Sequence, residues 1–218
     1  MLCGQSESLY RKKIAQFVDR LARRVTLDER PLDAGFARSA EPVPFERRLE
    51  LEYRPIREGQ RWGGAWDSAW FRLRGAVPPE WRGTRVVARL DFNGEALVFS
   101  DDGVPLQGLT NGSVLAPADV HSARTRFPVV DAAAGGETVD LWVEAAANAL
   151  FGVNREKDPP ADCPTRHGTY EGRLNLARLA VFDENVWQLW LDMHVLLRLL
   201  EAQPEGSSRR ARLLRGLN

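Results

Sequence analysis

The chain lacks the features that mark secreted, disulfide-linked and membrane proteins. Only two of its 218 residues are cysteine, Cys3 and Cys163, and neither stands in a CxxC or Cys/His spacing. Isolated cysteines of this kind are typical of inert thiols in a reduced, cytosolic compartment. No apolar run approaches the roughly 18 residues needed to span a bilayer, and residues 1–10 lack the charged and apolar regions of a secretion signal. We expect a cytoplasmic protein with no membrane partner.

The chain also lacks net charge. Thirty Lys and Arg residues balance thirty Asp and Glu residues, so bulk electrostatics give no reason to expect a nucleic-acid partner. The hydrophobic fraction of 44% and the charged fraction of 28% are ordinary for a soluble globular protein. A chain of this length can build one sizeable core, or one domain with appended helices.

Clustered metal ligands are missing as well. The three histidines, His121, His167 and His194, are too far apart in the sequence to form a local zinc pair. His194 lies in a helical pattern, where a packing role is expected. No nucleophile-elbow pattern is present. The sequence therefore predicts no catalytic residue, no metal site and no cofactor in this chain.

Helical periodicity is confined to the two ends. Near the N-terminus, apolar residues recur at helical spacing: Tyr10, Ile14, Phe17, Leu21 and Val25. The next segment, 26–44, contains three prolines, so we expect residues 1–44 to form a helix and an extended connector. Asp183 can cap a second helix, whose apolar stripe is Val186, Trp190, Met193, Leu197 and Leu200. A second stripe on this helix, Trp187, Leu191 and His194, would need a further neighbour.

Between these ends, residues 45–182 show the pattern of a β domain. Leu49, Leu51 and Tyr53 alternate with charged residues, as in a half-buried strand. Asp101–Gly103 is typical of a tight hairpin. Short strands separated by Gly, Pro, Asn and Asp predict an antiparallel sandwich or jelly roll. The other strand candidates are 69–73, 86–92, 96–100, 124–130, 138–145 and 174–182.

Three stretches, taken in order, carry a family resemblance: Trp62–Phe71, Asn93–Leu109 and Trp142–Gly152. Together they resemble the N-terminal, non-catalytic part of the cytosolic-type class II α-mannosidases, glycoside hydrolase family 38, from about Thr26 to about Leu200. The resemblance implies a galactose-binding-domain-like β-sandwich with flanking helices at 1–44 and 183–218. It also implies that the partner is a catalytic domain of the same polypeptide, with retaining chemistry, zinc or a similar divalent ion, and a His-x-His-type motif. No such motif occurs here.

Five residues are candidates for contacts with carbohydrate or with another domain: Trp62, Trp66, Asp102, Gln107 and Asn148. Indole faces stack on the C–H surfaces of sugars, and Gly63–Gly64 beside the first two permits close backbone approach. Asp102 and Gln107 lie in the second family-like stretch. Asn148 stands among small residues, where a buried amide needs partners. Trp70 and Trp142 are expected to pack in the core or at the edge of the sandwich.

Two other functions fit the same sequence. A stand-alone carbohydrate-binding module would present an open aromatic platform with convergent polar groups. An oligomerisation module would expose its helical stripes, giving a homodimer without sugar binding. In the mannosidase interpretation, the Trp187 and Leu191 stripe would instead meet the catalytic domain.

Overall fold

The computed structural model describes residues 4–64, 66–110, 124–148 and 171–217. They form two compact units, one comprising residues 29–181 and the other the two ends of the chain, up to residue 28 and from residue 182. Cys3, Cys163, His121, His167 and the end of the Trp142–Gly152 stretch lie outside the described residues.

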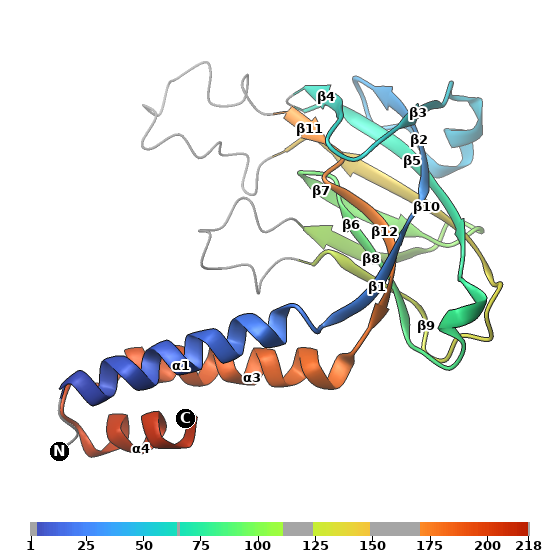
Figure 1. The fold of residues 1–218 in the computed structure, drawn as a ribbon. Helices are drawn as coiled ribbons and strands as arrows, with labels where there is room; N and C mark the ends of the chain where they lie inside the picture. Colours follow the sequence, from blue (N-terminus) through green and yellow to red (C-terminus); the bar gives the residue numbers. More distant parts are fainter. Residues whose placement is uncertain (1–3, 65, 111–123, 149–170, 218) are drawn as a thin grey trace, which may run out of the picture. The chain divides into compact units, whose positions relative to one another are not determined.

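The larger unit is an antiparallel β-sandwich, as the sequence predicts (Figure 1). One sheet has the strand order β3-β2-β5-β10-β7-β8 and the other has the order β1-β12-β6-β9, while β11 and β4 form a two-stranded sheet. The strands of the first sheet are β2 (Asp33–Ser39), β3 (Arg54–Ile56), β5 (Ser68–Ala76), β7 (Glu95–Phe99), β8 (Pro105–Thr110) and β10 (Thr138–Ala146). The remaining strands are β1 (Thr26–Pro31), β4 (Arg61–Gly64), β6 (Val86–Asp91), β9 (Arg126–Val130), β11 (Glu171–Arg173) and β12 (Leu176–Phe182).

Alternation along the strands builds the core between the two sheets. In β10, Val139, Val143 and Ala145 belong to the core cluster, so their neighbours along the strand face away from the core. Phe71 of β5 and Phe92 lie at the centre with ring centroids 4.6 Å apart. The predicted hairpin also forms: β7 pairs with β8 through the turn at Asp101–Gly103.

Two expectations for the first part of the β domain need correction. Residues 49–53 do not form a strand, because Phe45–Glu50 is a 3-10 helix, η1. The residues expected as a connector instead supply β1 and β2, so strand pairing starts well before Phe45. The prolines at 31, 42 and 44 lie at or beyond the ends of these strands, which is where a strand tolerates them.

The η1 segment covers part of the outer face of the six-stranded sheet. The Trp70 indole N–H donates to the carbonyl of Val43 at 2.7 Å. The Arg48 guanidinium lies 3.5 Å from the Phe45 ring centroid and 4.5 Å from that of Trp142. Tyr53 packs edge-on against Trp142, and burial raises the pKa of its hydroxyl to about 12. Trp70 and Trp142 are therefore packing residues, as expected.

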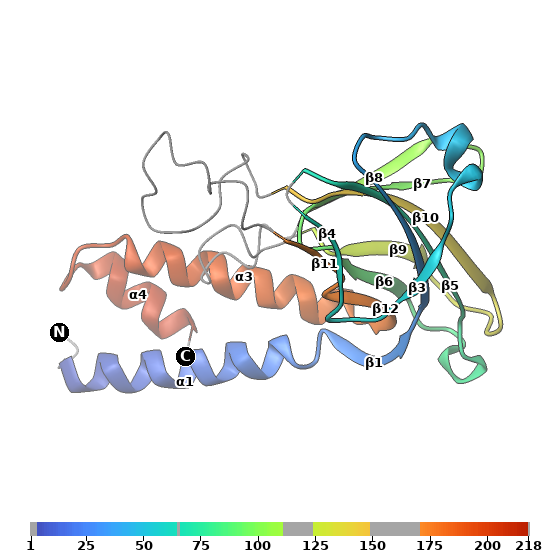
Figure 2. The same ribbon diagram turned by 90° about the horizontal axis from the view of Figure 1, so that it is seen from above.

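The smaller unit contains three helices: α1 (Gly4–Ala22), α3 (Glu184–Glu201) and α4 (Ser208–Leu217). Figures 1 and 2 both show α1 and α3 side by side. The predicted stripe of α3 packs in a cluster with Ile14, Val18 and Leu21 of α1. Asp183 caps α3 by accepting a hydrogen bond from the N–H of Val186 at 3.0 Å. Phe17 is 38% exposed, and Val18 takes its place in the cluster.

We predict that Trp142→Ala lowers the free energy of unfolding by about 3–5 kcal/mol, since a large aromatic side chain is removed from a packed site. The Trp142 side chain is 5% exposed. Chemical denaturation measures the change. An unchanged unfolding midpoint would contradict this packing, and Leu106→Ala, at a side chain 52% exposed, is the control.

Candidate functional site

The pairing of β5 with β10 determines which side chains lie on the outer face of the six-stranded sheet. Their register places Glu144 opposite Trp70, and Ala146 opposite Ser68. On the other side of β10, Glu144 lies opposite Leu97, and Ala146 lies opposite Glu95. Because Val143 and Ala145 point into the core, Glu144 and Ala146 lie on the outer face.

Glu144 is a half-buried carboxylate near the middle of this face. Burial raises its pKa above the ordinary value for glutamate. In the part of the chain that the structure describes, no hydrogen bond or charged neighbour offsets that burial. The side chain therefore has unused acceptor capacity for a ligand's hydroxyl or cationic group.

Asn148 and Glu95 form a two-point pair on the same face as Glu144, beyond the end of β10. The backbone N–H of Glu95 donates to Asn148 Oδ1 at 3.1 Å, and Asn148 Nδ2 donates to Glu95 Oε2 at 2.9 Å. Gly94 lets the two strands meet, because a Cβ there would lie 2.2 Å from the carbonyl oxygen of Ala146. The side-chain amide of Asn148, which was predicted to need hydrogen-bond partners, therefore has them on the neighbouring strand β7.

Trp66 occupies a bulge beside Asn148. Its backbone N–H donates to the carbonyl of Ala147 at 2.9 Å, and the N–H of Ala147 donates to the carbonyl of Asp67 at 2.8 Å. Two residues of one strand thus face one residue of its partner, as in a G1-type bulge, where glycine is usual. Trp66 has φ +69° and an indole 54% exposed. An aromatic residue in this backbone conformation is strained.

We call Trp66, Glu95, Glu144 and Asn148 the β10 cluster. It combines an exposed aromatic face, an amide and two carboxylates, drawn from β5, β7 and β10 and from the residues at their ends. Two of the five candidates from the sequence, Trp66 and Asn148, come together here. Alternation along β10 could have placed Glu144 on this face, but its neighbours on β5 and β7 depend on strand pairing across the sheet.

Asp102 and Gln107 lie away from this cluster. Asp102 is in the hairpin turn at the opposite end of β7 from Glu95. A hydrogen bond from the Ser100 hydroxyl lowers the pKa of Asp102. Gln107 donates from Nε2 to the carbonyl of Arg126 in β9 at 2.6 Å, which links the two sheets. Both side chains have local structural contacts.

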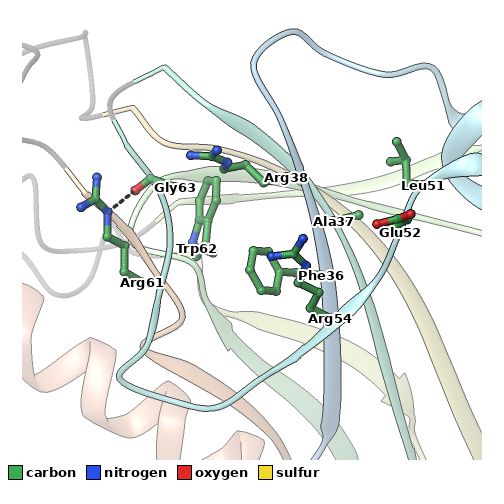
Figure 3. Close-up of a pocket in the computed structure, with 9 residues that line it drawn as sticks. All are labelled: Phe36, Ala37, Arg38, Leu51, Glu52, Arg54, Arg61, Trp62 and Gly63. Atoms are coloured by element: carbon green, nitrogen blue, oxygen red, sulfur yellow. Dashed lines mark hydrogen bonds between the residues drawn. The ribbon is translucent and has the colours of Figure 1, made fainter.

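Trp62 lies in the core and forms part of the floor of a separate cleft (Figure 3). It is 2% exposed, and its indole N–H donates to the carbonyl of Phe92 at 3.0 Å. Gly172 allows β11 to pass over the ring, because a Cβ there would lie 2.5 Å from the indole. The cleft measures about 450 Å³ and also has Phe36, Arg38, Arg54 and Arg61 in its lining. Sequence reasoning missed these four residues.

The metal-ligating side chains of the described ranges are dispersed. No three His, Cys, Asp or Glu side chains there are grouped as a metal site. Among those residues, no helix is long and apolar enough to cross a membrane. His194 packs against Trp190, with ring centroids 4.6 Å apart.

The raised pKa of Glu144 predicts a pH-dependent stability. The ionised carboxylate is less well hydrated in the folded protein than in the unfolded chain, where its pKa is about 4.3. This loss of hydration lowers the free energy of unfolding at pH values above the pKa of Glu144 in the folded protein. The loss of stability fades as the pH falls from that pKa to the pKa in the unfolded chain. Glu144→Gln should therefore raise the melting temperature at pH 7 and leave it unchanged near pH 4. A variant that is less stable than wild type at pH 7 would contradict this.

Comparison with known proteins identifies the family. The family model described as "Alpha-mannosidase, jelly roll domain" matches residues 30–185. Alpha-mannosidase 2C1 of Mus musculus is 31% identical over 178 residues, which are 82% of this chain and 16% of the relative. Alpha-mannosidase 2C1 of Homo sapiens is 28% identical over 171 residues, 78% of this chain and 15% of the relative. Alpha-mannosidase G of Dictyostelium discoideum is 25% identical over the same shares.

Solved structures match this chain at low similarity. A beta-glucuronidase from an uncultured Clostridium has a TM-score of 0.43 and 13% identity over 72% of this chain and 29% of its own. The beta-glucuronidase of Faecalibacterium prausnitzii has a TM-score of 0.38 and 17% identity over 72% and 32%. These likenesses carry no functional weight. The family match and the sequence relatives identify the family: this chain belongs to the alpha-mannosidase jelly roll domain family.

Proposed function

We propose that the chain is the N-terminal accessory domain of an alpha-mannosidase that hydrolyses terminal α-mannosides. The match of the jelly roll family over residues 30–185 is the observation that carries the proposal. The chain spans 16% and 15% of the length of the two 2C1 relatives, which leaves room in such a protein for a separate catalytic domain. In this proposal the parent enzyme works in the cytoplasm with retention of configuration, and the accessory domain packs on the catalytic domain.

The metal and the reacting carboxylates belong to that catalytic domain in this proposal. The zinc or similar divalent ion would be held there, and a pair of carboxyl groups would act on the glycosidic bond as in other retaining glycosidases. The jelly roll domain contributes binding surface instead. Its role is to hold part of the oligosaccharide or to fix the position of the catalytic domain.

The β10 cluster is the surface that we assign to carbohydrate. Sugar sites combine an apolar face with a few placed polar groups, and Trp66 provides the apolar face. The Glu144 carboxylate can accept two hydroxyl hydrogen bonds, which would offset the burial that raises its pKa. The Asn148–Glu95 pair keeps an amide and a carboxylate in fixed positions on the same face.

The strain at Trp66 supports the same assignment. Glycine adopts φ +69° without penalty, whereas an L-residue there costs roughly 1–2 kcal/mol. Trp66 is also 54% exposed. A strained backbone at an aromatic residue that leaves half of its surface open supports a contact with a ligand.

Titration of the chain with α-linked mannobiose tests the assignment. We expect weak binding by isothermal titration calorimetry. The affinity should fall about tenfold or more in Trp66→Gly, since the stacking of a base on an aromatic side chain in nucleic-acid sites is worth about 1–3 kcal/mol. Trp66→Gly should melt at or above the wild-type temperature, because the substitution relieves backbone strain.

Leu106→Ala is the matched control, because this β8 side chain is 52% exposed and lies outside the cluster. Equal affinity of wild type and Trp66→Gly would exclude the β10 cluster as the sugar site.

A second candidate role is oligomerisation through α3. Its side chains Leu189, Val195 and Leu196 are 44%, 66% and 37% exposed. A helix that is apolar around most of its circumference needs more than one neighbour. In the complete enzyme that neighbour would be the catalytic domain, and in the separate chain it would be a second copy.

Analytical ultracentrifugation tests the second role. We expect a monomer–dimer equilibrium in the wild type, shifted towards monomer by Leu189→Glu with Leu196→Glu. Gln188→Glu, at an exposed polar position on the same helix, is the control for an added negative charge. A strictly monomeric wild type at high concentration would contradict self-association through this helix.

A further inference from the structure

A cleft at the edge of the sandwich lies apart from the β10 cluster and has a different chemistry. It opens where β3 ends, because β3 pairs with β2 only from Ala34 to Phe36. Beyond Phe36, β2 continues to Ser39 with β5 as its partner on one side. The cleft of about 450 Å³ lies between that part of β2, Leu51–Glu52 and β4. Its volume falls within the range of small-molecule sites.

The floor of the cleft is apolar and rigid. Phe36 stacks on Phe71 with ring centroids 5.9 Å apart, and Trp62 meets Phe71 edge-on at 5.5 Å. The Trp62 N–H is already used by the carbonyl of Phe92, and the side chain is 2% exposed, so the indole supports the floor from below and presents almost no surface to the cleft. An apolar group of a ligand would meet the partly exposed ring of Phe36, which stacks on Phe71.

The rim of the cleft carries three guanidinium groups, from Arg38, Arg54 and Arg61. Arg54 lies opposite Phe36 in the β2–β3 register. Figure 3 shows Arg38 and Arg54 extending beside the two aromatic rings, while Arg61 bends towards the carbonyl of Gly63. Three strands thus bring hydrogen-bond donors to one opening.

These guanidiniums differ in how much of their capacity is used. Arg38 pairs with Asp67 at 3.1 Å, and Arg61 pairs with Glu171 at 3.2 Å. The guanidinium of Arg54 has no hydrogen bond or ion pair with any residue in the described part of the chain. A guanidinium has five donor hydrogens, so donors on Arg54 and Arg38 remain for a ligand. Among the described residues, Glu52 is the only acidic one in the lining.

We propose that this cleft binds a small organic oxyanion, with its carboxylate or phosphate group on Arg54 and Arg38 and its apolar body against Phe36. Guanidinium groups suit both anions because their planar fork matches two oxygens at once. The site is independent of the proposed sugar contact at the β10 cluster. The two sites share no residue.

Calorimetric titration of the whole chain tests the site with benzoate, phenyl phosphate and neutral benzyl alcohol. Benzoate or phenyl phosphate should bind, and the tighter of the two identifies the anion class. Benzyl alcohol should bind at least about tenfold more weakly, because hydrogen bonds to a charged group are the stronger kind. Added salt should weaken binding of the anions. The Trp62 indole N–H signal in the NMR spectrum should shift with each bound anion.

Two variants of the cleft should change its affinity for the anion in opposite directions. Arg54→Gln should weaken binding of the anion by roughly tenfold or more, while Glu52→Gln should strengthen it by removing a like charge. Arg57→Gln, an exposed arginine outside the cleft, should leave it unchanged. All three substituted positions are exposed, so the variants should fold. No binding of either anion, equal binding of benzyl alcohol, or equal losses in Arg54→Gln and Arg57→Gln would overturn the proposal.

Discussion

The antiparallel pairing of β5 with β10 is the constraint on which the larger unit depends. It runs without a register shift from Ser68 opposite Ala146 to Ala76 opposite Thr138. Because side chains alternate, a slip of one residue would exchange the two faces of a strand. The observed register puts Phe71 and Val143 in the core, and the same register puts Glu144 and Ala146 outside. Core packing and the position of the β10 cluster thus follow from one pairing.

One part of the outer face of this sheet makes structural contacts, and another part carries the proposed binding groups. The η1 segment covers Trp70, Phe99 and Trp142 through ring contacts of Phe45 and a guanidinium contact of Arg48. Further along β10, the face carries Glu144, Ala146 and the Asn148–Glu95 pair. Packing of the first half holds the strands rigid, which keeps the polar groups of the second half in place. A half-buried carboxylate beside this covering segment is consistent with a contact surface.

The sequence predicted those parts of the fold that local pattern determines. Alternation predicted the central strands, turn chemistry predicted the Asp101–Gly103 hairpin, and capping predicted the role of Asp183. The pattern of short strands predicted a sandwich or jelly roll, and the family resemblance agreed with it. β1 and β2 were missed because prolines punctuate their segment, and the apparent strand at Leu49–Tyr53 was wrong because η1 packs by tertiary contacts. Trp66 and Asn148 were found as residues, but their meeting with Glu95 and Glu144 depends on pairing between distant strands. The Arg54 cleft depends on the unpredicted β2–β3 pair, so no local signal could have found it.

The central claim is that a mannosidase jelly roll domain uses the β10 cluster to contact carbohydrate. NMR mapping with α-linked mannobiose tests it most directly, since the side-chain amide of Asn148 and the indole N–H of Trp66 report on the cluster itself. The account predicts that both signals shift together and saturate, while the indole N–H of Trp62, bonded to Phe92, stays in place. Saturating shifts at Trp62 with none at Asn148 or Trp66, or no shifts at any concentration, would contradict it.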